Sequence, residues 1–507
     1  MSFLGRHRIL VLLVLPFFMG AVWLVYEVWA SLNAKPAPDT DYGAQMRALM
    51  LEAQQVADGP ARDDVRLAEA WREFSAELTQ VSGSIETLLF ESIEAAELPG
   101  TPFIADRGYD WSVVTDTDSW REQAADSPPG DLTSEQALAE LESVHAALAV
   151  AAESEVAAEA FASLLARARS GEPLVRPYSS RQLLINQLLP ELGQYRRMAQ
   201  FSVAWMEHAV QSEDWQAYAE GLEASLWMAE LAASDPVIIG NLVGVAIESL
   251  MLERVRNDVL RGRLPAEVLG RVDELIKQHE RPDLAFSLRG ERTWALDAVQ
   301  WMHDSRGRLL LSRTGTLTMG VGGSRVMNLG SIAFPRRAET EARFKEFYGR
   351  MIEAAEMPIA AAKVELASLD QEIDGLSGRQ VLLGMLAPAI GKAVSVSWSA
   401  DLNRAGLLTL LAIERYRVAT GVLPASLDEM MPVYLDAVPM DPFAAGETLV
   451  YRLDDTESLG GVGYVLYSVG PDGVDDGGVV GDNPLVRYRR GADGLDWMLT
   501  RSAEPGP

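Results

Sequence analysis

The feature that most constrains this chain is a region of strong helical periodicity, from about residue 183 to residue 278. Apolar residues recur there at spacings of three and four, which places them on one face of an α-helix. A polar turn at Gln211–Asp214 separates two such patterns. We therefore expect two helices packed against each other as a hairpin.

The pattern continues beyond this hairpin. Asp235-Pro236 is a helix start, and the segment Val237–Leu252 is apolar on nearly all sides apart from Asn241 and Glu248. It is too short and too polar to cross a membrane, so it is interpreted as the buried central helix of a bundle. A further helix is expected from Leu264-Pro265 to about His279.

Residues 204–233 weakly resemble a tetratricopeptide-type hairpin, with an acidic turn between two helices that carry alanine and aromatic residues. No period of about 34 residues repeats across the region, which argues against a true repeat array. An α-helical scaffold is the prediction that remains.

Composition limits the classes of partner. The chain has 507 residues, enough for two or three domains. It carries 73 acidic and 44 basic residues, a formal charge of −29 that repels phosphate backbones and anionic headgroups. We expect no nucleic-acid partner. The absence of cysteine excludes disulfide bonds and thiol chemistry.

The N-terminus indicates a membrane anchor. Arg6, His7 and Arg8 precede an uncharged run, Ile9–Tyr26, that is close to the roughly 20 residues of a bilayer span. The positive-inside rule predicts a cytoplasmic N-terminus, with residues 9–30 in the inner membrane and the bulk of the chain in the periplasm. A cleaved signal peptide is the alternative, but the run is longer than the usual apolar region of about 7 to 15 residues.

The chain divides into five expected parts. Residues 1–34 form the cytoplasmic tip and transmembrane anchor, 35–180 a helical region with a long loop, and 181–373 a helical bundle domain. Residues 374–398 form a glycine-punctuated linker, and 399–507 a small C-terminal module. The glycine-rich stretch 314–331 lacks the phosphate-loop spacing and its lysine, so a mobile connecting loop is expected there.

The C-terminal module has an α+β pattern. An amphipathic helix is predicted from about Ser399 to Gly421, where glycine ends it. Two strands are predicted at Leu449–Leu453 and Tyr464–Val469, followed by the acidic loop sequence GPDGVDDGG. A helix followed by a small antiparallel sheet is the expected arrangement, and the fold class as a whole is mainly α.

This order of motifs resembles the C-terminal globular part of the type II secretion major pseudopilins. The matching residues are Arg415-Tyr416, Leu423-Pro424, Asp441-Pro442-Phe443 and the run from Tyr464 to Gly478. The resemblance covers only about the last fifth of the chain. Two differences stand beside it: the chain lacks the prepilin-type N-terminus, and the helix begins far from the anchor. A reused pseudopilin-like head, and not a fibre subunit, is what the resemblance implies.

The resemblance also implies a calcium site in the acidic loop, formed by Asp472, Asp475, Asp476 and Asp482. Clustered carboxylates repel one another unless they are solvated or bridged, and hard oxygen ligands suit Ca²⁺. Within this set the match is strongest for Asp475 and Asp476. A solvated acidic turn is the alternative that the residues alone favour.

No catalytic motif is present. The sequence has no HExxH, GxSxG, SxxK or Walker pattern, and its five histidines are scattered. One hypothesis is a membrane-anchored extracytoplasmic interaction or assembly protein with a calcium-stabilised pseudopilin-like head, associated with a type II secretion or pilus-like system. The alternative is a membrane-anchored periplasmic hydrolase or ligand-binding protein whose site includes His208, His279 or His303.

Overall fold

The structure is a computed structural model that describes residues 26–56, 64–95, 133, 149–179, 181–187, 189–318, 325–386, 390–444, 446–453, 463–478 and 496–500. Helices and one small antiparallel sheet are the regular elements within these residues, which confirms the mainly α prediction. The predicted span Ile9–Tyr26 lies outside the described residues except for Tyr26. None of the helices in the described ranges has the length and apolar character needed to cross a membrane.

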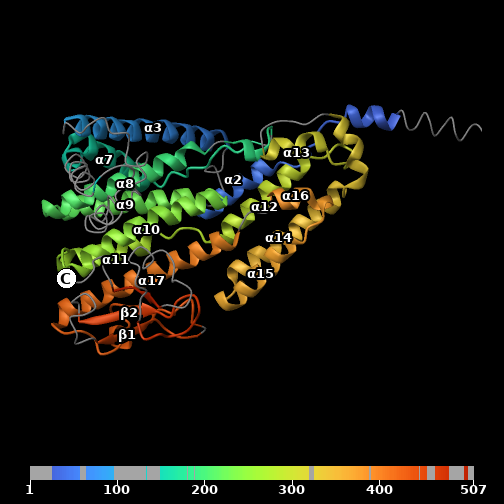
Figure 1. Ribbon diagram of the computed structural model, residues 1–507. Helices are drawn as coiled ribbons and strands as arrows, with labels where there is room; N and C mark the ends of the chain where they lie inside the picture. The colour runs from blue at the N-terminus through green and yellow to red at the C-terminus, as the bar shows by residue number, and fades with distance from the viewer. Residues whose placement is uncertain are drawn as a thin grey trace, which may run out of the picture.

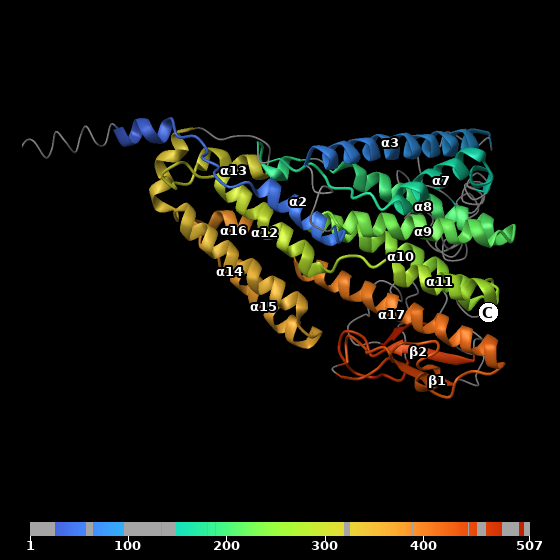
Figure 2. The same cartoon turned by 180° about the vertical axis from the view of Figure 1, so that it is seen from behind.

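A stack of long helices forms the body. It contains α3 (Asp64–Ala95), α8 (Pro190–Gln211), α9 (Trp215–Ala233), α10 (Ile238–Leu260) and α17 (Ile390–Thr420), each packed on the next (Figures 1 and 2). Two shorter helices, α7 (Glu155–Ser170) and α11 (Ala266–Gln278), pack against α9. Asp214 caps α9 by accepting a hydrogen bond of 3.0 Å from the amide of Ala217. The predicted hairpin and the helices that follow it are thus confirmed.

Helix α10 occupies the centre of the stack, as its apolar sequence predicts. The two polar residues that interrupt its apolar first part are buried, with Asn241 0% and Glu248 2% exposed. The Glu248 carboxylate accepts a hydrogen bond of 2.7 Å from Arg281, so the buried charge is compensated.

A second group of helices lies beside the stack. It comprises α2 (Tyr42–Ala53), α12 (Leu284–Trp301), α14 (Arg337–Glu356) and α15 (Ile359–Asp374), with α12 packed on α2 and α14, and α14 packed on α15. Shorter helical segments complete it: η3 (Leu184–Asn186), α13 (Leu311–Thr318), η4 (Arg325–Ala333), η5 (Gly378–Gln380) and α16 (Val381–Leu386). Where α12 passes the start of α10, Gly290 lies directly against the Pro236 carbonyl.

The C-terminal head is a three-stranded antiparallel sheet packed on the end of α17. After η6 (Leu427–Met430), the strands β1 (Val450–Leu453), β2 (Tyr464–Ser468) and β3 (Trp497–Met498) follow in that order across the sheet. Leu453 pairs with Tyr464, and Ser468 pairs with Trp497. Both predicted strands are confirmed, as is the role of Gly421, which ends α17 with a φ of +79°.

Two expectations about connecting segments need correction. Residues 374–398 were expected to form a linker, but α16 buries Leu382 and Leu383 in the core, and α17 begins at Ile390, before the expected start at Ser399. The boundary at residue 399 therefore falls inside a helix. Likewise, the stretch expected to be a loop at 314–331 contains the end of α13 and most of η4, while residues 319–324 between them lie outside the described residues. Long-range contacts hold the described parts: the Tyr348 hydroxyl donates to the Leu386 carbonyl at 3.0 Å, and the Asn328 side chain donates to the Ser31 carbonyl at 3.4 Å.

The molecule as a whole is wedge-shaped. Its narrow end carries the N-terminal helical segment, residues 26–32, with α13 beside it. The head and the far ends of α3 and α9 lie at the broad end (Figures 1 and 2). The acidic loop of the head therefore lies towards the broad end, and the N-terminal helical segment lies at the narrow end.

Candidate functional site

The acidic loop begins where β2 ends, and the aspartate of the Asp-Pro-Phe motif holds it there. Asp441 is 3% exposed. Its carboxylate accepts hydrogen bonds from the Ser468 hydroxyl at 2.8 Å, the Val469 amide at 2.9 Å and the Phe443 amide at 2.9 Å. The motif therefore fixes the point at which the chain leaves the sheet.

Two of the predicted ligands form local turns within the loop. Asp472 accepts a hydrogen bond of 3.1 Å from the Val474 amide. Asp475 accepts one of 2.8 Å from the Gly477 amide and one of 3.0 Å from the Tyr467 hydroxyl. Burial and the bond to Asp475 raise the pKa of Tyr467 to about 12, so the phenol remains a donor at neutral pH. Tyr467 thus ties the loop to strand β2.

A carboxylate outside the predicted set closes the loop. Asp496, which directly precedes β3 and is 4% exposed, accepts hydrogen bonds from the amides of Gly478 at 2.6 Å and Asp476 at 3.3 Å. Burial raises the pKa of the Asp496 carboxyl, and the negative charges of Asp475 and Asp476 raise it further. Asp496 therefore lies close enough to Asp475 and Asp476, two of the predicted ligands, for their negative charges to repel its own. No local motif marks it in the sequence.

The predicted calcium ligands are brought together only in part. Asp475 and Asp476 lie near Asp496, whereas Asp472 serves its own turn and Asp482 lies outside the described residues. Within the described ranges, no three His, Asp or Glu side chains are grouped closely enough to hold a metal ion. The donor set is nevertheless made entirely of oxygen atoms, which is the type that Ca²⁺ prefers.

The helical body contacts the same loop. Lys363 of α15 donates a hydrogen bond to the Pro471 carbonyl, and its ammonium lies 5.8 Å from the centre of the Phe443 ring. This contact links a body helix to both the Asp-Pro-Phe motif and the loop. Sequence reasoning missed it because the partners lie about a hundred residues apart.

Ion pairs join the head helix to the body. Arg404 of α17 donates to Glu248 of α10 and, at 2.9 Å, to the His279 carbonyl. Further along α17, Arg415 pairs with Asp273 of α11 at 2.8 Å. Because one continuous helix belongs to both parts, the head cannot swing freely on the body.

A second set of ion pairs fixes the N-terminal segment at the narrow end. Arg308 pairs with Glu27 at 2.5 Å, and Arg306 contacts the same carboxylate at 3.3 Å. The Arg306 guanidinium also lies 5.1 Å from the centre of the Tyr26 ring. The helical segment that leads out of the body is thereby held against it.

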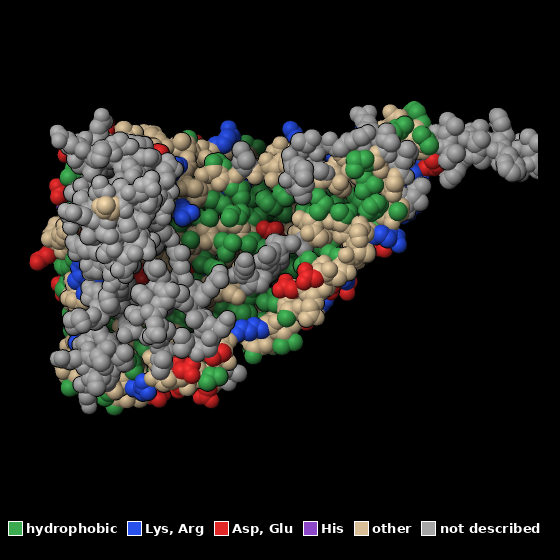
Figure 3. Space-filling model, viewed as in Figure 1, with side chains coloured by type: hydrophobic (Ala, Val, Ile, Leu, Met, Phe, Trp, Pro, Cys, Tyr) green, Lys and Arg blue, Asp and Glu red, His purple; other side chains and the backbone are tan. Residues whose placement is uncertain are grey.

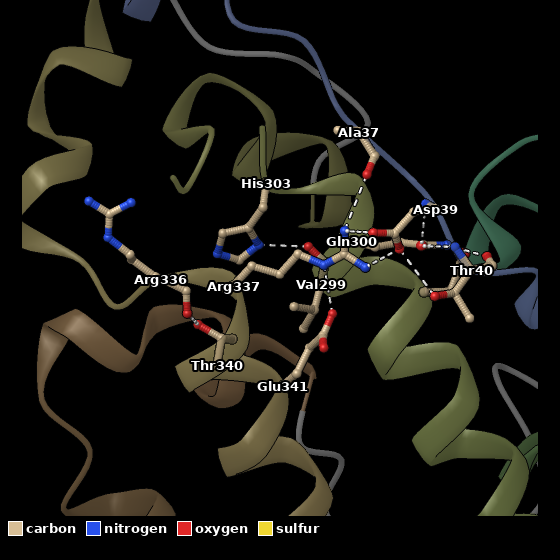
Figure 4. A network of polar contacts seen from close by, with 11 residues as sticks. Ala37, Asp39, Thr40, Val299, Gln300, His303, Arg336, Arg337, Thr340 and Glu341 are labelled. Carbon is tan, nitrogen blue, oxygen red and sulfur yellow. Dashed lines mark hydrogen bonds and ion pairs between the residues drawn. The ribbon is translucent and has the colours of Figure 1, made fainter. Parts of the chain in front are cut away.

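The proline-containing segment after this helix is also fixed, by the network shown in Figure 4. Arg337 donates to Asp39 at 2.6 Å and to the Ala37 carbonyl at 3.2 Å. Gln300 accepts from the amides of Asp39 and Thr40 and donates to the Thr40 carbonyl. Residues 37–40 are therefore part of the folded body.

The three histidines of the alternative hypothesis do not share a site. His208 lies 3.8 Å from Glu153, and His279 lies 3.1 Å from Glu230. His303 is buried, its Nδ1 lies 2.7 Å from the Val299 carbonyl (Figure 4), and burial lowers its pKa. Each ring therefore has its own separate partners.

A cavity of about 430 Å³ lies elsewhere, between α14 and the α16 region. Its rim carries Arg343 and Arg379, and its floor includes Phe344, Leu382 and Leu383. No histidine lines it. The cavity therefore contains none of the three histidines named in the hydrolase hypothesis.

Two buried charge clusters in the body are compensated internally. Arg176 pairs with Glu191 and Asp235, both at 2.8 Å. Arg254 pairs with Asp258 at 2.7 Å and Glu207 at 2.6 Å. Burial alone would raise the pKa of Glu207, but the nearby arginines lower it to about 2. Glu207 therefore stays charged at neutral pH, which suits a structural role better than proton transfer.

Comparison of the chain with known protein families, with curated proteins and with solved structures finds no match.

Proposed function

We propose that this protein is a membrane-anchored extracytoplasmic interaction or assembly protein that presents a pseudopilin-like head in a fixed orientation. The anchor would be the uncharged run before Glu27. A secretion or pilus-like system in the inner membrane is the proposed setting.

One observation carries the proposal: α17 packs on α10 and α11 in the body and on β2 in the head. A catalytic domain needs a prepared pocket, whereas an adaptor needs two surfaces at a defined distance and angle. The continuous helix supplies that rigid link. The pairs from Glu27 to Arg306 and Arg308 supply a second one, between the body and the segment that leads to the proposed anchor.

The acidic loop is the proposed calcium-dependent part of the head. Asp475 and Asp476 would hold the ion, with Asp496 as the added carboxylate and Asp472 and Asp482 as the more distant candidates. Calcium would offset the mutual repulsion of these groups. It would thereby stabilise the presented surface, and the resemblance to pseudopilins supports this assignment.

Site-specific crosslinking tests the proposed function. The natural chain has no cysteine, so a single cysteine can be placed at Val433 or Val474 in the head, which are 72% and 54% exposed. Val65→Cys on α3, where valine is 67% exposed, is the control. Adducts with a secretion or pilus-like envelope protein from the head positions, and none from position 65, are expected.

The opposite pattern would overturn the proposal. If neither head position forms an adduct with an envelope protein, or if position 65 gives the same adducts as the head, the head is not a specific interaction surface.

A further inference from the structure

The narrow end of the wedge has a charge unlike that of the rest of the chain. Between residues 305 and 338 the sequence contains six arginines and no aspartate or glutamate, although the whole chain carries 73 acidic and 44 basic residues. This stretch forms α13 and η4 and reaches the start of α14. A basic segment of this kind in an acidic protein needs a local explanation.

Contacts place the basic segment around the N-terminal helical segment. Arg306 and Arg308 hold Glu27, and the Asn328 side chain donates to the Ser31 carbonyl at 3.4 Å. The two regions also lie together at the narrow end in both views (Figures 1 and 2). The basic segment thus surrounds the point at which the chain leads to the proposed anchor.

Arg336 has no carboxylate partner among the described residues, whereas Arg337 of the same segment pairs with Asp39 and Glu341, each at 2.6 Å. Arg306 and Arg308 share the single carboxylate of Glu27. Arg336 is exposed, and the hydrogen bond it donates goes to the Arg306 carbonyl at 2.9 Å. That bond does not neutralise the guanidinium. Arg336 therefore adds an uncompensated positive charge to this surface.

Exposed apolar side chains accompany these arginines. Tyr26 is 50%, Trp29 61% and Met327 49% exposed. Figure 3 shows hydrophobic side chains over α13 and the N-terminal helical segment at this end of the molecule. Aromatic rings beside arginines are the composition that suits the boundary between lipid headgroups and water.

We propose that residues 26–33, together with the described parts of 305–338, form a membrane-contact surface that binds anionic phospholipid headgroups. The inference rests on the proposed anchor, because a span ending near Tyr26 sets this surface at the level of the headgroups. Arginine matches the geometry of phosphate oxygens, and the exposed rings and Met327 enter the interface. The strongly acidic remainder of the chain is repelled by the same lipids, so the wedge stands away from the bilayer.

Lipid-quenching measurements on the full chain test this surface. A fluorophore on Met327→Cys is the probe, and one on Val364→Cys of α15, where valine is 72% exposed, is its control. Each labelled protein is reconstituted into vesicles of phosphatidylcholine, alone or mixed with phosphatidylglycerol, that contain brominated lipid. We expect phosphatidylglycerol to increase quenching at position 327 and added salt to reverse the increase, with no change at position 364.

A matched pair of substitutions tests the role of charge. The quenching at position 327 gives the ratio of molecules whose surface is bound to lipid to molecules whose surface is not. Arg336→Gln should lower this ratio by about fivefold in mixed vesicles, which is the effect of one basic side chain near a charged membrane. Arg196→Gln, on an exposed arginine of α8, should leave that ratio unchanged. Quenching at position 327 that ignores phosphatidylglycerol, or equal effects of the two substitutions, would overturn the inference.

Failure of the anchor gives a different result. Retention on pure phosphatidylcholine vesicles after an alkaline wash reports the anchor alone. If the chain is washed off but still binds mixed vesicles with salt-sensitive quenching at position 327, the surface is supported and the anchor is wrong. If the chain is retained and position 327 does not respond to phosphatidylglycerol, the anchor stands and the surface is wrong.

Discussion

Arg404 on α17 donates to the buried carboxylate of Glu248 on α10, and this ion pair joins the helix of the head to the centre of the body. Arg281 donates to the other oxygen of the same carboxylate at 2.7 Å. The orientation of the head is thus set at a buried carboxylate of the central helix α10.

Replacing Arg404 with methionine should lower the free energy of unfolding by about 2 kcal/mol, because Glu248 keeps Arg281 but loses one of its two charged hydrogen-bond donors. Urea unfolding followed by circular dichroism measures the change. Arg197→Met is the control, since Arg197 is 51% exposed and lies 3.7 Å from Glu86. A loss below about 1 kcal/mol is expected for the control. Equal losses in the two variants would show that the pair does not secure the head.

Gly290→Ala and Gly270→Ala should have opposite effects on stability. A methyl group at position 290 would overlap the Pro236 carbonyl, so α12 would have to move away from α10. We expect a loss of about 3 kcal/mol. At position 270, in α11, no atom lies within 4 Å of the added carbon, and alanine should gain about 0.5–1 kcal/mol from helix propensity. Thermal unfolding of both variants decides whether the helix crossing is as close as described.

Calcium should raise the melting temperature of the head in the millimolar range, relative to a chelator. Asp475→Asn should abolish most of this rise, because the amide keeps an acceptor oxygen for Tyr467 and Gly477 but loses the charge. Asp436→Asn, at a head carboxylate that is 92% exposed, should leave the rise intact. Coincident melting curves of the natural protein in calcium and in chelator would rule out the site.

Glu291 should make stability fall as the pH rises. Burial raises the pKa of this carboxyl from 4.5 to about 7, so the folded state holds a proton that the unfolded state releases. Its contribution is complete below pH 4.5 and is lost as the pH rises through about 7. Glu291→Gln retains an acceptor for the Ile238 amide and should remove this part of the dependence.

The difference between natural protein and variant isolates the group from others that titrate nearby. Urea unfolding at several pH values should show Glu291→Gln to be the more stable of the two above about pH 7, by about 1–3 kcal/mol. The exposed Glu267 supplies the control, Glu267→Gln. Parallel pH profiles for Glu291→Gln and the natural protein would refute the prediction.

Much of the fold could be predicted from local patterns. The spacing of Leu192, Tyr195 and Val203 predicts α8, and Gly421 marks the end of α17, because helix periodicity and capping depend on residues a few positions apart. The start of α17 was missed, because packing between distant segments, and not local propensity, makes residues 390–398 helical.

The candidate site shows the same division. Asp475 and Asp476 could be selected because they are adjacent in a glycine-rich run. Asp496 could not, since it reaches the loop only through the pairing of β2 with β3. Lys363 reaches it only through the packing of α15 near the head.

The sequence by itself determined the helical class, the small C-terminal sheet and the acidic loop, since each is recorded in neighbouring residues. Only the tertiary structure decided that head, body and N-terminal segment form one rigid wedge. The physical reason is that buried ion pairs such as Arg404–Glu248 and clamps such as Arg308–Glu27 join residues more than a hundred positions apart. No local pattern encodes a contact of that kind.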